Sequence, residues 1–324
     1  MDELLQALKA AGEPTRMRIL LVLYRSELTV SEICRILAQS QPRVSRHLRL
    51  LCDAGLLTRQ AEGTSAYYRH ARTPFAEQFL ASIRSLTDLD DATVEHDREQ
   101  LSRVRSDREE LAARSYEKIA FESALLTDRQ VPVPLVESAM LDAVGPERIG
   151  RLLDIGTGTG RVLELFAHRI DHGVGIELSP EMLNLARTTL DRDDLSHCSV
   201  RHGNAYALEV GIGTVDLAVL HHVLHFLDEP ARAVEEAART IAADGRLLVV
   251  DYATHDVEAL RVKHGHRRLG FTEDEVIGWC RQADLGAVSV RSLTPASGAG
   301  LTITIWVAVQ RHDAPALHHL EAAT

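Results

Sequence analysis

The sequence has few of the features that mark secreted or membrane-spanning proteins. It has only four cysteines, at positions 34, 52, 198 and 280, isolated from one another, so it offers neither a disulfide framework nor a C-x-x-C site. No apolar run approaches the roughly 18 residues that a membrane-spanning helix needs. The N-terminus is acidic and amphipathic, unlike a signal peptide. These absences predict a cytoplasmic protein without a membrane segment.

Basic residues are fewer than acidic ones, 36 against 47, and their distribution is uneven. The formal net charge is −11. Residues 1–70 hold ten Lys and Arg against seven Asp and Glu, whereas residues 71–324 hold 26 against 40. We therefore expect only the N-terminal part to meet a polyanion. The 324 residues, 45% hydrophobic and 26% charged, suffice for two globular domains with a core each.

The most informative stretch has the sequence RLLDIGTGTGRVLELFA. Its apolar start predicts a buried parallel strand, and the apolar spacing after Gly156, Gly158 and Gly160 predicts a helix. Strand, glycine turn and helix open a nucleotide-binding unit, but a dinucleotide fingerprint would have its third glycine where Arg161 stands. Asp154 is a poor neighbour for a pyrophosphate and a good one for a ligand with an ammonium and a sulfonium. The stretch resembles motif I of the class I S-adenosylmethionine (SAM)-dependent methyltransferases.

The next predicted strand supports this resemblance. It ends at Glu177, about twenty residues past the glycines, where an acid can accept from both ribose hydroxyls. Ser179 and Pro180 then start a helix as N-cap and first helical residue. A lone glycine loop is also an ordinary tight turn, whereas the loop with both acids indicates an adenosyl ligand. The contacts to SAM or S-adenosylhomocysteine (SAH) that the resemblance implies are Asp154, Gly156, Gly158, Gly160, Glu177, Leu178, Met182, Asn204, Ala205, His221 and Tyr116.

The N-terminal region shows helices followed by a strand pair. The predicted helices span residues 4–11, 14–24, 30–37 and 41–54, and the predicted strands 56–59 and 65–69. The string SQPRVSRHLRLLCDAGLLTRQAEGTSAYYRH resembles the ArsR-type bacterial repressors, which are winged helix-turn-helix proteins. That resemblance places the helix from Gln41 in the major groove of duplex DNA. The implied DNA contacts are Gln41, Arg43, Ser45, Arg46, Arg49, Arg59, Thr64 and Arg69.

The same resemblance bears on metals and on assembly. Many members sense metals through paired cysteines on the helix before the recognition helix, but this sequence has only Cys34 there. One thiol cannot complete a three- or four-ligand site, so we expect no metal site in this region. The apolar helix that starts at Thr73 pairs protomers in the family, which implies a homodimer. A winged helix that contacts only proteins is the alternative.

A charged connector follows. From residue 91 to about 120, only Leu101, Val104 and Leu111 form a thin apolar stripe, which predicts a long exposed helix or a weak coiled coil. Tyr116 lies in a segment that resembles the one ahead of the core in UbiE-like methyltransferases. An aromatic side chain there can touch the cofactor, and plain packing is the alternative.

The remaining strands and helices alternate, which predicts a doubly wound sheet with its ligand where the strand order reverses. We expect strands over residues 199–202, 214–220 and 245–251, helices over 229–242 and 272–283, and a terminal antiparallel pair over 287–293 and 301–309. In the resembled family, a polar residue after the third strand meets the adenine edge, which makes Asn204 the candidate.

Histidines gather where a methyl acceptor would sit. They are His221, His222, His225, His255, His264 and His266. One of them would act as a general base or ligand contact, and lining the cleft without chemistry is the alternative. The pattern H-H-x-x-H also has metal-ligand spacing, but no carboxylate or cysteine stands beside it in the sequence. We therefore predict no metal.

Together these features predict an α/β chain with an N-terminal winged helix-turn-helix and a C-terminal Rossmann-like class I methyltransferase sheet. The expected parts are a DNA-binding and dimerisation domain (1–88), a helical connector (89–131), a methyltransferase-like domain (132–311) and a tail (312–324). We expect a transcriptional regulator whose second domain binds SAM or SAH and modulates operator binding. The alternative is an active small-molecule methyltransferase with an attached DNA-binding domain. No catalytic side chain need separate the two, since methyl transfer can rest on in-line positioning alone.

Overall fold

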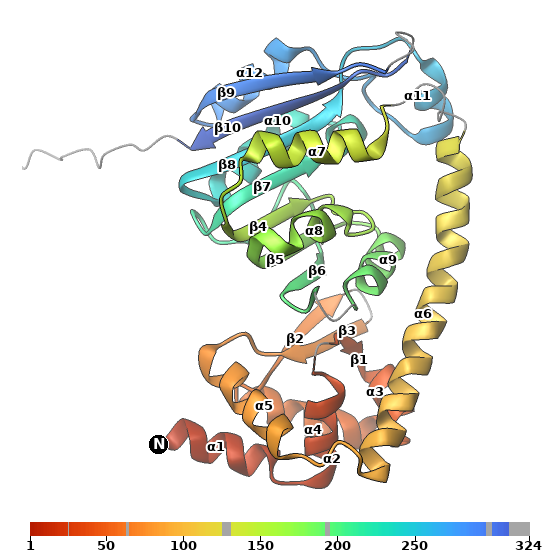
Figure 1. Ribbon diagram of the computed structural model, residues 1–324, viewed down its shortest axis with the longest axis vertical. Helices are drawn as coiled ribbons and strands as arrows, with labels where there is room; N and C mark the ends of the chain where they lie inside the picture. Colours follow the sequence, from red (N-terminus) through yellow and green to blue (C-terminus); the bar gives the residue numbers. More distant parts are fainter. Residues whose placement is uncertain (25, 63–64, 125–130, 192–194, 296–299, 311–324) are drawn as a thin grey trace, which may run out of the picture. The chain divides into compact units, whose positions relative to one another are not determined.

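A computed structural model gives the fold of the chain (Figure 1). It describes residues 1–24, 26–62, 65–124, 131–191, 195–295 and 300–310. The described residues form two compact units. The first holds Met1–Ile119 with Gly158–Gly160 and Ser179–His202, and the second holds the other described residues. None of the described helices is long and apolar enough to cross a membrane.

Short helices and a small sheet make up residues 1–86. The helices are α1 (Asp2–Ala11), α2 (Pro14–Val22), α3 (Val30–Leu37), α4 (Gln41–Asp53) and α5 (Pro74–Leu86); the strands are β1 (Leu28–Thr29), β2 (Leu57–Glu62) and β3 (Ser65–His70). The predicted winged helix-turn-helix is confirmed. The sequence did not predict the two-residue strand β1, which pairs antiparallel with β3.

Local signals explain the helix-turn-helix. A capping box between Thr29 and Glu32 starts α3, because each side chain accepts from the backbone N–H of the other residue. Ala38, at φ 53°, ends that helix in the left-handed conformation. Along α4, Val44 and Leu48 are fully buried. Burying a side chain of that size stabilises the fold by about 1.5–3 kcal/mol.

The predicted connector helix is present as α6 (Ala92–Ala124). Its first half is not wholly exposed, because Val104 is buried and Leu101 packs against the N-terminal core. Asp97 accepts two hydrogen bonds from Arg18 of α2, at 2.6 and 2.7 Å. The apolar stripe therefore packs this part of α6 on the N-terminal core, and Asp97 joins it to α2.

A seven-stranded sheet forms the second fold element. Its strands are β4 (Ile149–Ile155), β5 (Ile170–Glu177), β6 (Cys198–His202), β7 (Val215–His221), β8 (Ile241–Tyr252), β9 (Leu285–Leu293) and β10 (Ile303–Gln310). Their order is β6-β5-β4-β7-β8-β10-β9. β4 runs parallel to β5 and β7, and β7 runs parallel to β8. β10 pairs antiparallel with both β8 and β9, as predicted for the terminal strands.

Helices alternate with the strands along this part of the chain. They are α7 (Val133–Val144), α8 (Arg161–Phe166), α9 (Pro180–Leu190), α10 (Pro230–Thr240), α11 (Glu258–His264) and α12 (Glu273–Gln282), with 3-10 turns η2 (Ala167–Arg169) and η4 (Leu224–Phe226). α7 and α8 lie on one face of the sheet, and α10 and α12 on the other (Figure 1). The strand order reverses between β4 and β7, so the crevice at their carboxyl ends is the expected ligand position.

One boundary differs from the prediction. The helix expected to reach residue 242 ends at Thr240, and β8 starts at Ile241 rather than at residue 245. Ile241 pairs with Val215 across the parallel ladder, and the register then shifts before Arg246. Asp244, at φ 63°, lies in this irregular part. Pairing with β7 therefore overrides the helical preference of the alanines.

Candidate functional site

The glycine loop follows β4 directly. Gly156, Gly158 and Gly160 have φ of 75°, 54° and 81°, in the left-handed region that glycine adopts without strain. At Gly156 a Cβ would also lie 2.5 Å from Cγ2 of Val223. The backbone N–H groups of Gly156 and Thr157 donate to the carbonyl of Ile176, at 2.8 and 3.0 Å. The turn is thus tied to the end of β5, with room for glycine only at its first position.

Asp154, near the end of β4, is 1% exposed. The hydroxyl of Thr157 donates to its Oδ2 at 2.5 Å, and its Oδ1 is buried without a hydrogen-bond partner among the described residues. Burial raises the pKa of Asp154 to about 7, opposed by the Thr157 hydrogen bond and reinforced by the charge of Glu177. This carboxyl can therefore change its protonation state near neutral pH, and a nearby positive charge would favour the ionised form.

Glu177 ends the neighbouring strand β5 and is half-buried. Its Oε1 accepts from the backbone N–H of Leu178 at 2.9 Å. Asp154 lies opposite Gly175 in the parallel register, so the carboxyl ends of β4 and β5 carry one acid each. Leu178 is 60% exposed, and Met182 is half-buried in the first turn of α9, where its N–H donates to Ser179.

The segment after β6 returns to the end of β5. The N–H of Gly203 donates to the carbonyl of Glu177 at 3.0 Å, which places Asn204 next to that strand end. Asn204 is exposed, and its Oδ1 accepts from the N–H of Tyr206 at 3.0 Å. Ala205 is half-buried and packs against the core of the sheet. The structure thus brings the predicted Asn204 and Ala205 to the strand end that carries Glu177.

A cavity of ≈210 Å³ opens beside the ends of β7 and β8. Its lining residues are Val131, Val133, Val136, Glu137, Met140, Arg161, Val162, Leu165, His221, His222, Tyr252 and Ile303. The lining is mostly apolar, with one acid, one guanidinium, two imidazoles and one phenol. Arg161 stands at the third position of the dinucleotide fingerprint and is held by Glu137, at 2.6 and 2.9 Å. Tyr116 lies in α6, but its side chain is outside the described residues.

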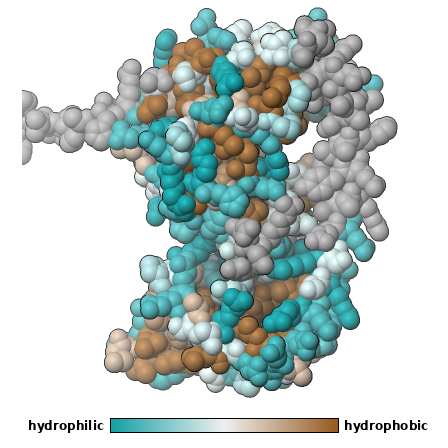
Figure 2. Space-filling model, in the orientation of Figure 1, coloured by the Kyte–Doolittle hydropathy of each residue, from teal (hydrophilic) through white to brown (hydrophobic). Residues whose placement is uncertain are grey.

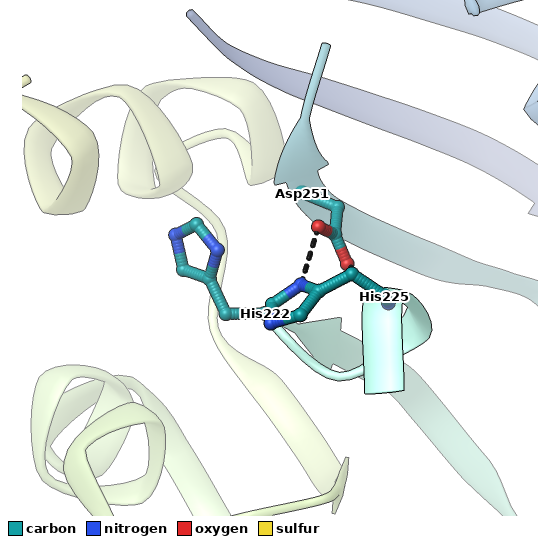
Figure 3. Close-up of side chains that lie close together, drawn as sticks. All are labelled: His222, His225 and Asp251. Atoms are coloured by element: carbon teal, nitrogen blue, oxygen red, sulfur yellow. Dashed lines mark hydrogen bonds and ion pairs between the residues drawn. The ribbon is translucent and has the colours of Figure 1, made fainter. Parts of the chain in front are cut away.

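Next to this cavity, His222, His225 and Asp251 gather where β7 and β8 end (Figure 3). His225 Nδ1 and Asp251 Oδ1 are 2.7 Å apart, and both side chains are buried. The expectation that no carboxylate lies beside the H-H-x-x-H histidines is therefore wrong, because the fold brings Asp251 into contact with His225. Asp251 comes from another strand, 26 residues from His225 along the chain, so no motif could signal the contact. The sequence offered one signal for this contact: His225 follows β7, and Asp251 lies near the end of the neighbouring parallel strand β8.

Burial governs the protonation of these groups. It lowers the pKa of His221 to about 4, of His222 to about 3 and of His266 to about 4, so these imidazoles are neutral at pH 7. Burial alone would raise the pKa of Asp251, but the charge and hydrogen bond of His225 outweigh it, and the pKa lies below its usual value. His222 itself has φ 53°, an uncommon conformation for a residue other than glycine.

The predicted DNA-contacting residues that the structure describes lie on α4, β2 and β3. On α4, Gln41, Arg43, Arg46 and Arg49 are exposed and Ser45 is half-buried; on β2, Arg59 is exposed; on β3, Arg69 is half-buried; and Thr64 lies outside the described residues. Burial lowers the pKa of Arg69 to about 10. The arginines of α4 and β2 are thus available to a polyanion, and Arg69 is less so.

Comparison with known proteins agrees with both parts of the fold. Residues 13–59 match the family model of bacterial regulatory proteins of the arsR family, and residues 153–249 match that of the methyltransferase domain. Over 107 residues the chain is 29% identical to the uncharacterized methyltransferase YcgJ of Bacillus subtilis, covering 33% of this chain and 42% of that protein. Over 110 residues it is 34% identical to a phosphatidylethanolamine N-methyltransferase of Cereibacter sphaeroides, covering 34% of this chain and 54% of that protein.

The chain thus spans about half the length of these relatives. The crystal structure of the Bacillus YcgJ protein aligns with a TM-score of 0.47 at 19% identity, covering 55% of this chain and 98% of that one. The chain carries an ArsR-type helix-turn-helix domain followed by a class I methyltransferase domain with a Rossmann-like sheet.

Proposed function

We propose that this chain is a DNA-binding transcriptional regulator whose methyltransferase domain binds SAM or SAH, and that the bound ligand alters operator affinity. The observation that supports it best is the pair of carboxylates, Asp154 and Glu177, on adjacent parallel strands around three left-handed glycines. A buried acid at the tip of β4 disfavours a pyrophosphate and favours a cationic ligand. The proposed extents of the two domains are residues 1–88 and 132–311.

Each predicted contact has a role in this proposal. Glu177 accepts from the ribose hydroxyls, Asn204 meets the adenine edge, and Asp154 faces the positively charged methionine end. The remaining positions, Leu178, Met182, Ala205 and His221, flank the same strand ends. Contacts of Tyr116 with the cofactor belong to the proposal as well.

In the N-terminal domain, α4 would enter the major groove of a double-stranded operator. Arg43, Arg46 and Arg49 are exposed on it, and α4 has no acidic residue before Asp53. Phosphate contacts by such residues release counterions, which makes binding strongly salt-dependent. Arg59 on β2 would add a backbone contact from the wing.

The proposal includes a homodimer formed through this domain. Leu4, Leu5 and Leu8 on α1 are 42%, 46% and 51% exposed, and Leu86 at the end of α5 is 86% exposed. Figure 2 shows hydrophobic surface over α1. Apolar surface of this kind on short terminal helices fits an isologous contact with a second copy.

A second candidate function is a working methyltransferase of a small molecule, with the DNA-binding domain attached. The ≈210 Å³ cavity favours it, because an apolar acceptor would fit beside His221 and Tyr252. The neutral imidazole of His221 could then accept a proton or orient the acceptor.

Calorimetry with SAM and SAH on the full chain tests ligand binding. Glu177→Ala leaves the ribose hydroxyls without their acceptor and should cost about 1–3 kcal/mol, or roughly 5- to 150-fold in affinity. Glu181→Ala is the matched control, because Glu181 lies exposed four residues along, in the first turn of α9. Absence of binding of either ligand at millimolar concentration would overturn the assignment.

Fluorescence anisotropy with a labelled operator separates the two candidates. SAM and SAH differ by one methyl group and one positive charge, and a ligand shifts an equilibrium only through its differential affinity. We expect saturating SAM and SAH to give operator affinities that differ at least about fivefold, with a reciprocal effect of DNA on ligand binding. Identical curves with SAM, SAH and no ligand would favour the tethered enzyme.

A further inference from the structure

The proposals above leave the cluster of His222, His225 and Asp251 without a role. Each of these residues offers a ligand-type atom, and the three atoms lie within 4.8 Å of one another. Figure 3 shows the His225 imidazole meeting the carboxylate of Asp251 on β8, with the His222 ring beside them. The cluster is built on strand ends, which hold side chains more precisely than long loops do.

Several nitrogen atoms around this cluster are buried without a hydrogen-bond partner among the described residues. They are Nδ1 of His222, Nδ1 of His266 and Nε2 of His255. The His266 ring stacks on His225, with centroids 4.1 Å apart. A buried polar atom without a partner costs about 1–3 kcal/mol. Of these atoms, Nδ1 of His222 belongs to the cluster itself, and it calls for a bound species that satisfies it.

We propose that His222, His225 and Asp251 bind a divalent transition-metal ion of the zinc class. Two imidazoles and one carboxylate are a borderline donor set, suited to zinc, cobalt or nickel. Magnesium and calcium prefer sites made of oxygen ligands alone. No cysteine takes part in this cluster, which disfavours a soft ion such as copper(I).

The geometry needs only side-chain adjustment. Ligand atoms of a tetrahedral ion with bonds of about 2.0–2.1 Å lie about 3.4 Å apart, so the widest gap must close by about 1.4 Å. His225 binds through Nδ1, which now faces Asp251 at 2.7 Å. The ion takes the place of that hydrogen bond, and the imidazole of His225 then binds as the neutral tautomer that carries its proton on Nε2.

A purely structural His225–Asp251 pair is the competing explanation. It would pin η4 to β8 and account for those two residues, but it leaves Nδ1 of the neighbouring His222 unsatisfied. His222 also lines the ≈210 Å³ cavity together with Tyr252. An ion with three protein ligands keeps an open position, and here that position would face the cavity. The inference does not depend on SAM binding.

Titration of the metal-free full chain with cobalt(II) tests the site. Four-coordinate cobalt(II) absorbs strongly in the visible range, and zinc(II) then displaces it, which gives the zinc affinity by competition. We expect one equivalent of cobalt to give this absorption in the unchanged chain. Asp251→Asn and His222→Asn should each abolish it and weaken zinc binding at least about tenfold. Asparagine is chosen at 222 because it tolerates positive φ.

The matched control removes His318 and His319 together, an adjacent pair in the C-terminal sequence that could bind metal adventitiously. Both alanine substitutions should leave the cobalt absorption unchanged. Thermal unfolding of each variant without metal shows whether it is folded. If Asp251→Asn does not fold, His222→Asn alone provides the test. The proposal is overturned if no stoichiometric absorption develops, if it survives in a folded His222→Asn chain, or if it vanishes with the His318 and His319 pair.

Discussion

The protonation of Asp154 makes ligand binding depend on pH in a way that can be calculated. Burial raises the pKa of Asp154 to about 7, and the proposed ligand presents a positive charge to it. If binding requires the ionised carboxylate, affinity follows its ionised fraction. With a pKa of about 7, that fraction falls from about 0.76 at pH 7.5 to about 0.03 at pH 5.5. SAM affinity should therefore drop about 25-fold, or about 1.9 kcal/mol, over this interval.

The two histidines that line the cavity do not contribute to this pH dependence. The pKa of His221 is about 4 and that of His222 is about 3, so both stay neutral between pH 5.5 and 7.5. Calorimetry at each pH in two buffers with different ionisation enthalpies gives the number of protons released. At pH 6 about nine-tenths of Asp154 is protonated, so binding should release about 0.9 proton.

Asp154→Asn is the control, with opposite effects on binding and stability. SAM binding should become weaker and independent of pH. Because the pKa of Asp154 is raised in the fold, ionising this carboxyl destabilises the folded state. The contribution of Asp154 to the free energy of unfolding is therefore fully present below pH 4 and is lost as pH rises through about 7. The cost at pH 8 is on the order of 4 kcal/mol. The asparagine variant should therefore unfold at a higher denaturant concentration than the unchanged chain at pH 8, and at the same concentration at pH 4. A flat affinity profile, or proton release that persists in the variant, would refute the reasoning.

Two other substitutions probe the loop and the recognition helix. Gly156→Ala should destabilise the fold by about 1–3 kcal/mol and weaken SAM binding. Its Cβ would lie 2.5 Å from Val223 Cγ2, and the residue has a positive φ. Gly158→Ala has no atom within 4 Å of its Cβ and should cost less; equal losses in urea unfolding would contradict the steric explanation. Arg46→Ala should weaken operator binding in gel shifts, reduce the salt slope by about one and leave SAM affinity unchanged. If changing both Arg43 and Arg46 to alanine leaves operator binding unchanged, α4 is not the recognition helix.

The glycine loop shows what periodicity and turn chemistry can predict. The apolar residues before Gly156 and the helical spacing after Gly160 fixed a strand, a turn and a helix, because each signal is local. Glu177 could be placed at a strand end for the same reason. Because parallel neighbours bring their carboxyl ends to one edge, Asp154 and Glu177 could be expected at the same edge of the sheet.

Contacts between distant segments were beyond local signals. The sequence shows His225 beside other histidines, but nothing in it says that Asp251 lies 2.7 Å away. Burial is equally non-local: Arg69 sits in the predicted wing, yet packing leaves it half-buried. The strand β1 escaped notice because two residues, Leu28 and Thr29, carry no periodicity.

The place of β10 in the sheet has a consequence for how the protein is made. β10, near the end of the described chain, lies between β8 and β9, and its Trp306 is fully buried. Until Ile303–Gln310 leave the ribosome, β8 keeps an open edge and β9 has no partner strand in the sheet. An exposed apolar edge of this kind invites association with other chains. The sheet can close only after β10 has been synthesised, so a chain cut short before Ile303 should aggregate or be degraded rather than accumulate.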